Sequence, residues 1–349
     1  MADNYCKILG IDFIEFSAEN PQEMHNLFQA FGFSKVMSHT EKKIDLYKQN
    51  DIYFLLNSEP ASFGTKFYKE HGPCVSSMGW KSENADFSQK TAIERGAKSG
   101  DGKGDYKQDG EKLIPSIYGI GDSLIYFIDN FKDENRFERM GFKKLDNPEM
   151  VPNLGFEFID HLTNNVAQGQ MERWANFYKD IFGFYEVRYF DIKGAKTGLT
   201  SYALRSPDGS FCIPINEGTD KKSQINEYLD EYKGAGVQHI ALHTSNIIDS
   251  VARLQKEGVS TQEMDDEYYE EVFDRVPNVT EDHKKLQEHQ ILVDGDDEGY
   301  LLQIFTKNVI GPIFFEIIQR HNHLAFGEGN FGALFRSIER DQEKRGYLD

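Results

Sequence analysis

The sequence predicts an α+β fold that arose by tandem duplication, and two observations lead to this class. The chain has 349 residues, a length that fits two domains or one duplicated domain. Short runs of alternating apolar residues are followed by helical patterns, and the same landmarks occur in the same order in both halves. We expect paired βαβββ modules in each half, which together form an open, curved, mixed sheet.

The first landmark pair is a strand followed by a helix. GIDFIEFSAEN (10–20) is similar to GFEFIDHLTNN (155–165), and each run opens at a glycine. The helical stretches MHNLFQAFGFSKV (24–36) and WANFYKDIFGFYEV (174–187) follow, with apolar residues at spacings of three and four. In both stretches a glycine ends the helix before an extended run begins.

Two later landmarks continue the repeat. Residues 73–97 match residues 235–259 as a strand that leads into an amphipathic helix, and GDSLIYFID (121–129) resembles GPIFFEIIQ (311–319). Four matches in one order indicate duplication. We therefore predict an N-terminal domain over 1–130 and a C-terminal domain over 153–349.

The remaining segments are predicted from composition. The charged stretch 131–152 contains two prolines and is expected to be a linker. The acidic, tyrosine-rich stretch 263–288 is expected to be an irregular, solvated excursion. A final helix over 330–344 is predicted from apolar residues at 331, 334, 335 and 338, with Asn330 as a candidate N-cap.

Composition excludes several classes of function. The formal charge of −19 argues against a nucleic-acid partner, because such a chain repels phosphate backbones. No apolar run of 18 residues is present, so no membrane span is predicted, and no secretory signal pattern begins the chain. The three cysteines lie far apart, which is typical of free thiols in a reducing compartment. We expect a cytoplasmic protein.

The repeat also singles out a candidate metal site. Alignment of the halves places His161 opposite Phe16, His239 opposite Ser77 and Glu316 opposite Tyr126. Two imidazoles and one carboxylate on three strands can converge on one face of a curved sheet, the facial set that suits non-haem Fe(II). Mn and Zn accept the same ligands, and buried histidines that only pack are common.

Several motifs together resemble one known family. FFEIIQR (314–320), FGEGNFGALFRSIERDQ (326–342), GVQHIALHT (236–244) and PINEG (214–218) are similar to the 4-hydroxyphenylpyruvate dioxygenase family of the vicinal oxygen chelate superfamily. The resemblance is strongest from Gly155 onward. It implies two tandem vicinal oxygen chelate domains, of which the first lacks metal ligands, and a C-terminal lid helix.

The resemblance also implies the site residues. One Fe(II) per chain would be bound by His161, His239 and Glu316. The implied substrate-binding residues are Ser201, Asn216, Gln224, Gln238, Gln303, Phe305, Phe314, Phe326, Asn330 and Phe331. This chain departs from the pattern at His321 and His323, where relatives commonly carry Gly or Lys, just before the expected lid.

The implied reaction converts 4-hydroxyphenylpyruvate and O₂ to homogentisate and CO₂, in the breakdown of tyrosine and phenylalanine. The resemblance also implies a dimer or a tetramer. Three alternatives stay open at this point. They are a 4-hydroxymandelate synthase with the same iron site, an extradiol ring-cleaving dioxygenase, and a non-catalytic ligand-binding protein. The synthase tends to carry Tyr where this chain has Phe331, which favours the dioxygenase.

Overall fold

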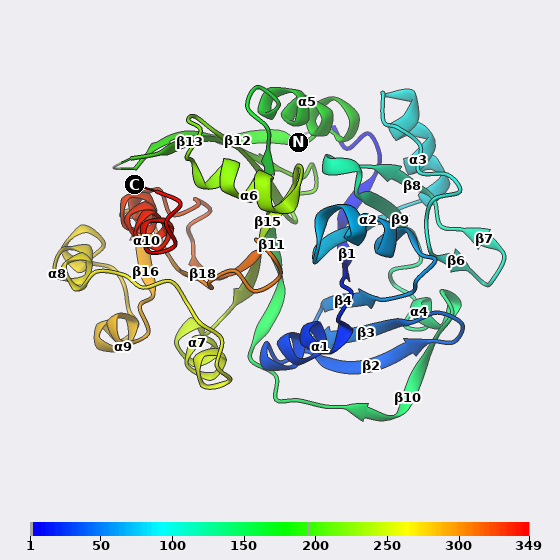
Figure 1. Cartoon of the computed structure of the whole chain (residues 1–349), viewed down its shortest axis with the longest axis horizontal. Coiled ribbons are helices and arrows are strands. Elements are labelled where there is room, and N and C mark those ends of the chain that lie inside the picture. Colours follow the sequence, from blue (N-terminus) through cyan, green and yellow to red (C-terminus); the bar gives the residue numbers. More distant parts are fainter. Residues whose placement is uncertain (1–2, 195, 349) are drawn as a thin grey trace.

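The chain forms two eight-stranded mixed sheets with helices on their outer faces (Figure 1). The computed structural model describes residues 3–194 and 196–348. The elements of the first half are β1 (Ile8–Ser17), α1 (Pro21–Ala30), β2 (Ser34–His39), β3 (Ile44–Gln49), β4 (Ile52–Asn57), α2 (Phe63–His71), β5 (Cys74–Ser82), α3 (Ala85–Glu94), β6 (Lys107–Gln108), β7 (Lys112–Leu113), β8 (Ser116–Tyr118), the 3₁₀ turn η1 (Ile120–Asp122), β9 (Leu124–Ile128), α4 (Arg136–Arg139) and β10 (Phe142–Glu149).

The second half begins with the same order of strands and helices and ends in a C-terminal helix. Its elements are β11 (Phe156–Val166), α5 (Met171–Phe182), β12 (Tyr185–Lys193), β13 (Gly198–Arg205), β14 (Cys212–Gly218), α6 (Gln224–Tyr232), β15 (Gly236–Thr244), α7 (Ile247–Lys256), α8 (Asp266–Arg275), α9 (His283–Glu288), β16 (Leu292–Gly295), β17 (Tyr300–Phe305), β18 (Phe314–His321), η2 (Glu328–Asn330) and α10 (Phe331–Lys344). No described helix has the length and apolar character needed to span a membrane.

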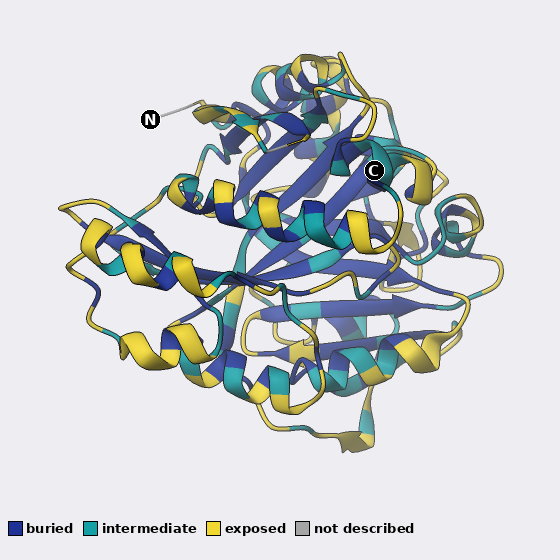
Figure 2. Cartoon of the chain, turned by 60° about the vertical axis from the view of Figure 1, so that its left-hand side comes forward, coloured by how far each residue is buried: buried dark blue, intermediate teal, exposed yellow. Residues whose placement is uncertain are grey.

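Seven strands of each sheet share one topology, which confirms the predicted fold class, and the eighth strand is β10 beside β2 in the first sheet and β16 beside β17 in the second. The strand orders are β10-β2-β3-β4-β1-β5-β9-β8 and β12-β13-β14-β11-β15-β18-β17-β16. The strand of each sheet that comes first along the chain, β1 or β11, runs parallel to one neighbour and antiparallel to the other. Figure 2 shows the resulting layers, with buried strands inside and helices whose exposed residues face outward.

The structural register corrects one part of the internal alignment. His161 pairs with Ala241 on β15, and the corresponding pair in the first sheet is Phe13 with Gly79 on β5. The predicted match of His161 to Phe16 was therefore wrong by three residues. The cause is that the two opening glycines are not equivalent, because the pairing with β5 and β15 places Gly155 opposite Lys7, three residues before Gly10. Ser77 and Tyr126 keep their predicted places opposite His239 and Glu316.

An apolar cluster fills the hollow face of the first sheet. Phe13 and Tyr126 pack there with Tyr106, whose ring lies 5.8 Å and 5.4 Å from theirs. The Tyr106 hydroxyl contacts the buried carboxylate of Glu15. Tyr106 comes from the segment between α3 and β8, which therefore closes this hollow.

Two segments have more regular structure than the sequence predicted. The stretch 131–152, expected to be a linker, contains α4 and β10, and β10 pairs with β2 at the edge of the first sheet. The stretch 263–288, expected to be irregular, contains α8 and α9. That expectation was wrong because Tyr269, Val272 and Leu286 form an inward apolar row on these acidic helices. The proposed domain division at 131–152 stays a prediction.

One buried core joins the two halves. Trp80 of β5 packs against Phe182 and Phe211 of the second half, at ring distances of 5.0 Å and 5.5 Å. Phe31, which follows α1, lies 4.6 Å from Phe315 of β18. The second sheet is therefore supported from behind by the first half, and this support holds its central strands in place.

Candidate metal centre

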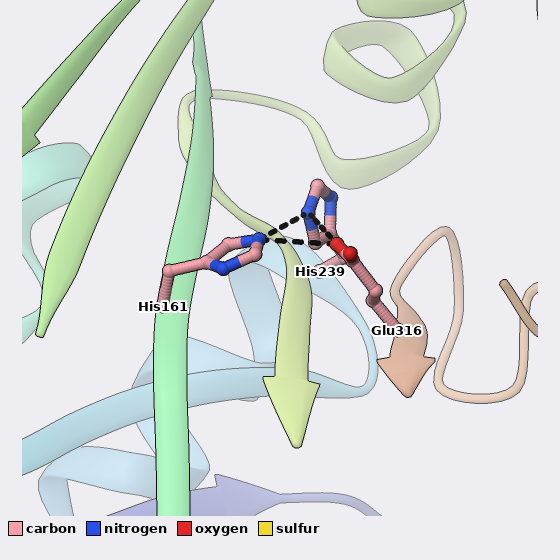
Figure 3. Close-up of side chains that lie close together, drawn as sticks. All are labelled: His161, His239 and Glu316. Atoms are coloured by element: carbon pink, nitrogen blue, oxygen red, sulfur yellow. Dashed lines mark hydrogen bonds and ion pairs between the residues drawn. The ribbon is translucent and has the colours of Figure 1, made fainter. Parts of the chain in front are cut away.

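Three polar side chains converge on the hollow face of the second sheet (Figure 3). His161 Nε2 lies 3.1 Å from Glu316 Oε2, and His239 Nε2 lies 3.4 Å from the same oxygen. The two Nε2 atoms are 3.4 Å apart. Among the described residues, this is the group of histidine, cysteine and carboxylate side chains that is arranged to hold a metal ion.

The strand register explains this convergence. His161 on β11 and Glu316 on β18 both pair with Ala241 on β15, so the two side chains flank that residue on one face. Ala241 leaves the space between them open because its side chain is a single methyl group. His239 lies two positions along β15 and therefore points to the same face.

Burial and charge set the protonation of the three groups. Burial alone would lower the pKa of His161, but Glu316 and Asp160 outweigh it and raise that pKa to about 9. Burial would raise the pKa of Glu316, but His161 and His239 lower it to about 2. Burial lowers the pKa of His239. A buried negative charge thus faces two imidazoles, a combination that favours a bound cation.

Hydrogen bonds to the far side of each imidazole test whether the residues fit a metal. His161 Nδ1 donates to Asp160 Oδ2 at 2.7 Å, and His239 Nδ1 donates to Gln238 Oε1 at 3.0 Å. These bonds leave Nε2 of each ring facing Glu316, and in the neutral state that metal ligation requires, each Nε2 presents a lone pair there. The donor set therefore fits a divalent metal, which would take the place of the proton on His161.

The spacing of the donors agrees with this test. Metal–nitrogen and metal–oxygen bonds of about 2.0–2.2 Å place adjacent donors roughly 3.0–3.4 Å apart, depending on the coordination geometry. The observed separations of 3.1–3.4 Å lie in that range. Histidine and carboxylate ligands suit iron, manganese and zinc alike, so the spacing supports a metal without selecting one.

A cavity of about 90 Å³ adjoins the three side chains. The sequence-predicted residues that line it are His161, Ser201, Asn216, Gln224, Gln238, His239, Phe305, Phe314, Glu316, Phe326 and Phe331. Two predicted residues do not line it. Gln303 is buried beside Gly327, and Asn330 accepts hydrogen bonds from Tyr268 and Arg275 through Oδ1.

The cavity has an aromatic wall and a polar wall. Phe314 stacks on His239 with ring centroids 4.8 Å apart, and Phe326 meets His161 edge-on at 5.5 Å. On the polar side, Asn216 Nδ2 lies 3.4 Å from Gln238 Oε1. Such a site can hold a flat ring by its faces and orient one polar group at its end.

Sequence reasoning missed part of the lining and both partners behind His161. The missed lining residues are Thr163, Phe190, Ile192, Leu199, Pro214, Leu334 and Phe335. Phe190 and Ile192 share one face of β12, so the alternation of that strand was a usable signal. Asp160 and Arg320 gave no such signal, because they meet only in the folded chain.

Asn330 and three further histidines of the second half have partners outside the three converging side chains. Asn330 precedes α10 as predicted, but its side chain makes no capping hydrogen bond. His243 bonds to Glu157, away from the centre, as its position along β15 predicts. His321 contacts Glu281, and His323 lies 3.7 Å from Asp296.

Comparison with known proteins assigns both halves to related families. Residues 2–143 match the family described as hydroxyphenylpyruvate dioxygenase, N-terminal. Residues 158–304 match the glyoxalase, bleomycin resistance protein and dioxygenase superfamily.

Individual relatives span almost the whole chain. Protein MelA of Shewanella colwelliana is 57% identical over 99% of this chain and 99% of its own length. The 4-hydroxyphenylpyruvate dioxygenase of Pseudomonas aeruginosa is 44% identical over 97% of this chain and 96% of its own. A solved triple mutant of 4-hydroxymandelate synthase from Streptomyces coelicolor has a TM-score of 0.83 at 20% identity, over 96% of this chain and 99% of that one, which shows a shared fold.

Proposed function

The chain belongs to the 4-hydroxyphenylpyruvate dioxygenase family, and from that premise we propose that it converts 4-hydroxyphenylpyruvate and O₂ to homogentisate and CO₂. We propose one Fe(II) per chain, with His161, His239 and Glu316 as its ligands. The observation that carries the proposal is the buried trio itself, whose Nε2 and Oε2 atoms lie 3.1–3.4 Å apart.

A facial set of three protein ligands suits this reaction. Fe(II) bound there would keep open positions for O₂ and for the keto and carboxylate oxygens of a 2-oxo acid. Carboxylate binding by Glu316 offsets part of the ion's charge, and Asp160 and Gln238 hold the two imidazoles in the tautomer that the metal requires.

The remaining lining would bind and orient the aromatic part of the substrate. Phe314 and Phe331 offer faces for the ring, while Asn216 and Gln238 offer amides for the phenol hydroxyl. A buried amide that loses its hydroxyl partner costs free energy, so this wall would select for a hydroxylated ring. The helix α10 covers the cavity with Leu334 and Phe335 and would exclude water.

Product analysis tests the proposal directly. The purified chain, loaded with ferrous salt, is incubated with 4-hydroxyphenylpyruvate, and the product is identified by chromatography and mass. Homogentisate with stoichiometric CO₂ is expected. Hydroxymandelate would assign the synthase reaction instead, and no turnover with bound metal would favour a ligand-binding protein.

The variant Glu316→Gln tests the metal centre. Gln has nearly the same shape but no charge, so metal content and oxygen uptake should both fall by at least tenfold. Glu157→Gln, which alters a partner of His243 outside the centre, is the matched control and should keep both. Unchanged turnover in Glu316→Gln would remove the proposed ligand set.

We also propose a cytoplasmic location and a homo-oligomer, a dimer or a tetramer. Cell fractionation and light scattering of the purified protein measure these two properties independently of activity.

A further inference from the structure

A buried ion pair lies directly behind His161. Asp160 Oδ2 accepts the Nδ1 proton of His161 at 2.7 Å. Arg320 of β18 contacts both oxygens of Asp160, at 2.7 Å from Nε to Oδ1 and 2.8 Å from Nη2 to Oδ2. The Asp160 and Arg320 side chains are each 11% exposed. Two parallel N–H···O bonds fix the carboxylate more strictly than one bond does.

The same guanidinium also holds the segment that begins at the last residue of β18. Arg320 Nη1 donates to the carbonyl oxygens of His323 at 3.1 Å and Ala325 at 2.6 Å. Its charged centre lies 5.9 Å from the ring of Phe326. We call residues 321–327 the Phe326 segment. Its backbone is therefore tied to the residue that holds Asp160.

The Phe326 segment returns to the metal centre. Phe326 lines the cavity, meets the His161 ring edge-on at 5.5 Å, and lies 6.2 Å from Phe190. A closed circuit of contacts thus runs from His161 through Asp160 and Arg320 to Phe326 and back to His161. Chains of packed and hydrogen-bonded side chains of this kind can carry coupling between two sites.

We propose that Asp160 and Arg320 are a positioning pair, which orients His161 for metal binding and couples that orientation to closure of the Phe326 segment over the cavity. The inference rests on the proposed function, which supplies the metal. Because coupling between two binding events is reciprocal, a bound metal should stabilise the closed segment, and the closed segment should strengthen metal binding. Neither residue touches the reacting atoms.

The test measures metal affinity and segment exchange without turnover. Metal-free wild type and Arg320→Met are titrated with Co²⁺ by calorimetry, and amide hydrogen exchange of residues 321–327 is followed with and without Co²⁺. We expect Co²⁺ to slow exchange in wild type. In Arg320→Met we expect a Kd about 10- to 100-fold higher, as for other losses behind a metal ligand, and no slowing of exchange at saturating Co²⁺.

A second buried arginine–aspartate pair provides the matched control. Arg136 contacts Asp12 in the first half, at 3.2 Å from Nε to Oδ2 and 3.1 Å from Nη2 to Oδ1. Arg136→Met should lower the melting temperature, as Arg320→Met does, but should keep wild-type Co²⁺ affinity and the wild-type exchange response. If the two variants behave alike in affinity and exchange, the pair at Arg320 is only structural and the proposal is overturned.

Two milder variants keep the proposal falsifiable if Arg320→Met does not fold. Arg320→Lys retains the charge but loses the fork of donors, and Asp160→Asn retains an acceptor for His161 but loses the ion pair. Each should weaken Co²⁺ binding and reduce the exchange response, and wild-type values in both would overturn the inference. Wild type that binds no Co²⁺ would overturn the metal centre itself. Normal binding by wild type and variants alike would overturn only the positioning pair.

Discussion

Metal binding should release about one proton per ion at pH 7.5, because the metal-free centre holds a proton where the metal would lie. The pKa of His161 is raised to about 9, so its ring is protonated at that pH. A metal ligand must be unprotonated, and the proton therefore leaves as the metal enters. His239, whose pKa is lowered, adds no proton.

The contribution of His161 to folding stability follows from the shift of its pKa. Burial acts against it, but Glu316 and Asp160 raise the pKa of His161 from 6.5 to about 9, which corresponds to about 3 kcal/mol of folding free energy. This contribution is fully present below pH 6.5 and is lost as the pH rises through 9. The same ion pair lowers the pKa of Glu316 from 4.5 to about 2. That contribution is present above pH 4.5 and is lost as the pH falls toward 2.

Two measurements check this prediction. Calorimetric titration with Co²⁺ at pH 7.5, in buffers of different ionisation enthalpy, gives the number of protons released. Denaturant unfolding of the metal-free protein at pH 6 and pH 9 gives the stability change, which should be larger in wild type than in Glu316→Gln, because the variant keeps only the part that Asp160 contributes. A proton count near zero, together with equal pH dependence in the two proteins, would refute the reasoning.

Three further predictions concern other parts of the chain. Glu339→Gln removes the carboxylate that accepts hydrogen bonds from the turn before β13, so α10 should loosen. The amount of oxygen consumed per molecule of product, measured by electrode and chromatography, should then rise about two- to tenfold. A wild-type ratio would contradict the covering role of α10. Gly327→Ala should displace the Phe326 segment and lower kcat/KM at least tenfold, because residue 327 has φ +79° and a Cβ there would lie 2.1 Å from Gln303 Nε2; wild-type kinetics would show that the segment adjusts freely. Burial, and then Asp105, raises the pKa of Glu15 from 4.5 to about 7, so this group should cost wild type about 3 kcal/mol of stability as the pH rises from 4.5 through 7. Glu15→Gln should remove that loss in denaturant unfolding, and an unchanged slope would contradict it.

The fold was predictable because duplication supplies its own evidence. Each half repeats the same sequence of strand, helix and strands, and the four matched landmarks anticipated both sheets. Register was not predictable in the same way. Gly10 and Gly155 open similar apolar runs but are not equivalent, because Gly155 corresponds to Lys7, so His161 was matched to Phe16 although Phe13 lies in the equivalent place.

The centre was easier to predict than its surroundings. His161, His239 and Glu316 differ in kind from their counterparts in the first half, so the repeat made them visible. Gln303 and Asn330 were predicted to line the cavity because of their motifs, yet one packs beside Gly327 and the other bonds to Tyr268. Whether Gln303 and Asn330 face the cavity depends on the path of the chain after β18. The alternation of residues within strands does not predict that path.

Side chains fill the hollow face of the first sheet, which limits the transfer of a metal site to it. Changing Phe13, Ser77 and Tyr126 to two histidines and a glutamate would copy the donor atoms, but the Tyr106 side chain would still occupy the volume that a guest molecule requires. A second substrate cavity would first require removal of residues 99–113, which carry the Tyr106 hydroxyl that contacts Glu15. Three substitutions alone would therefore not turn the first sheet into a second working site.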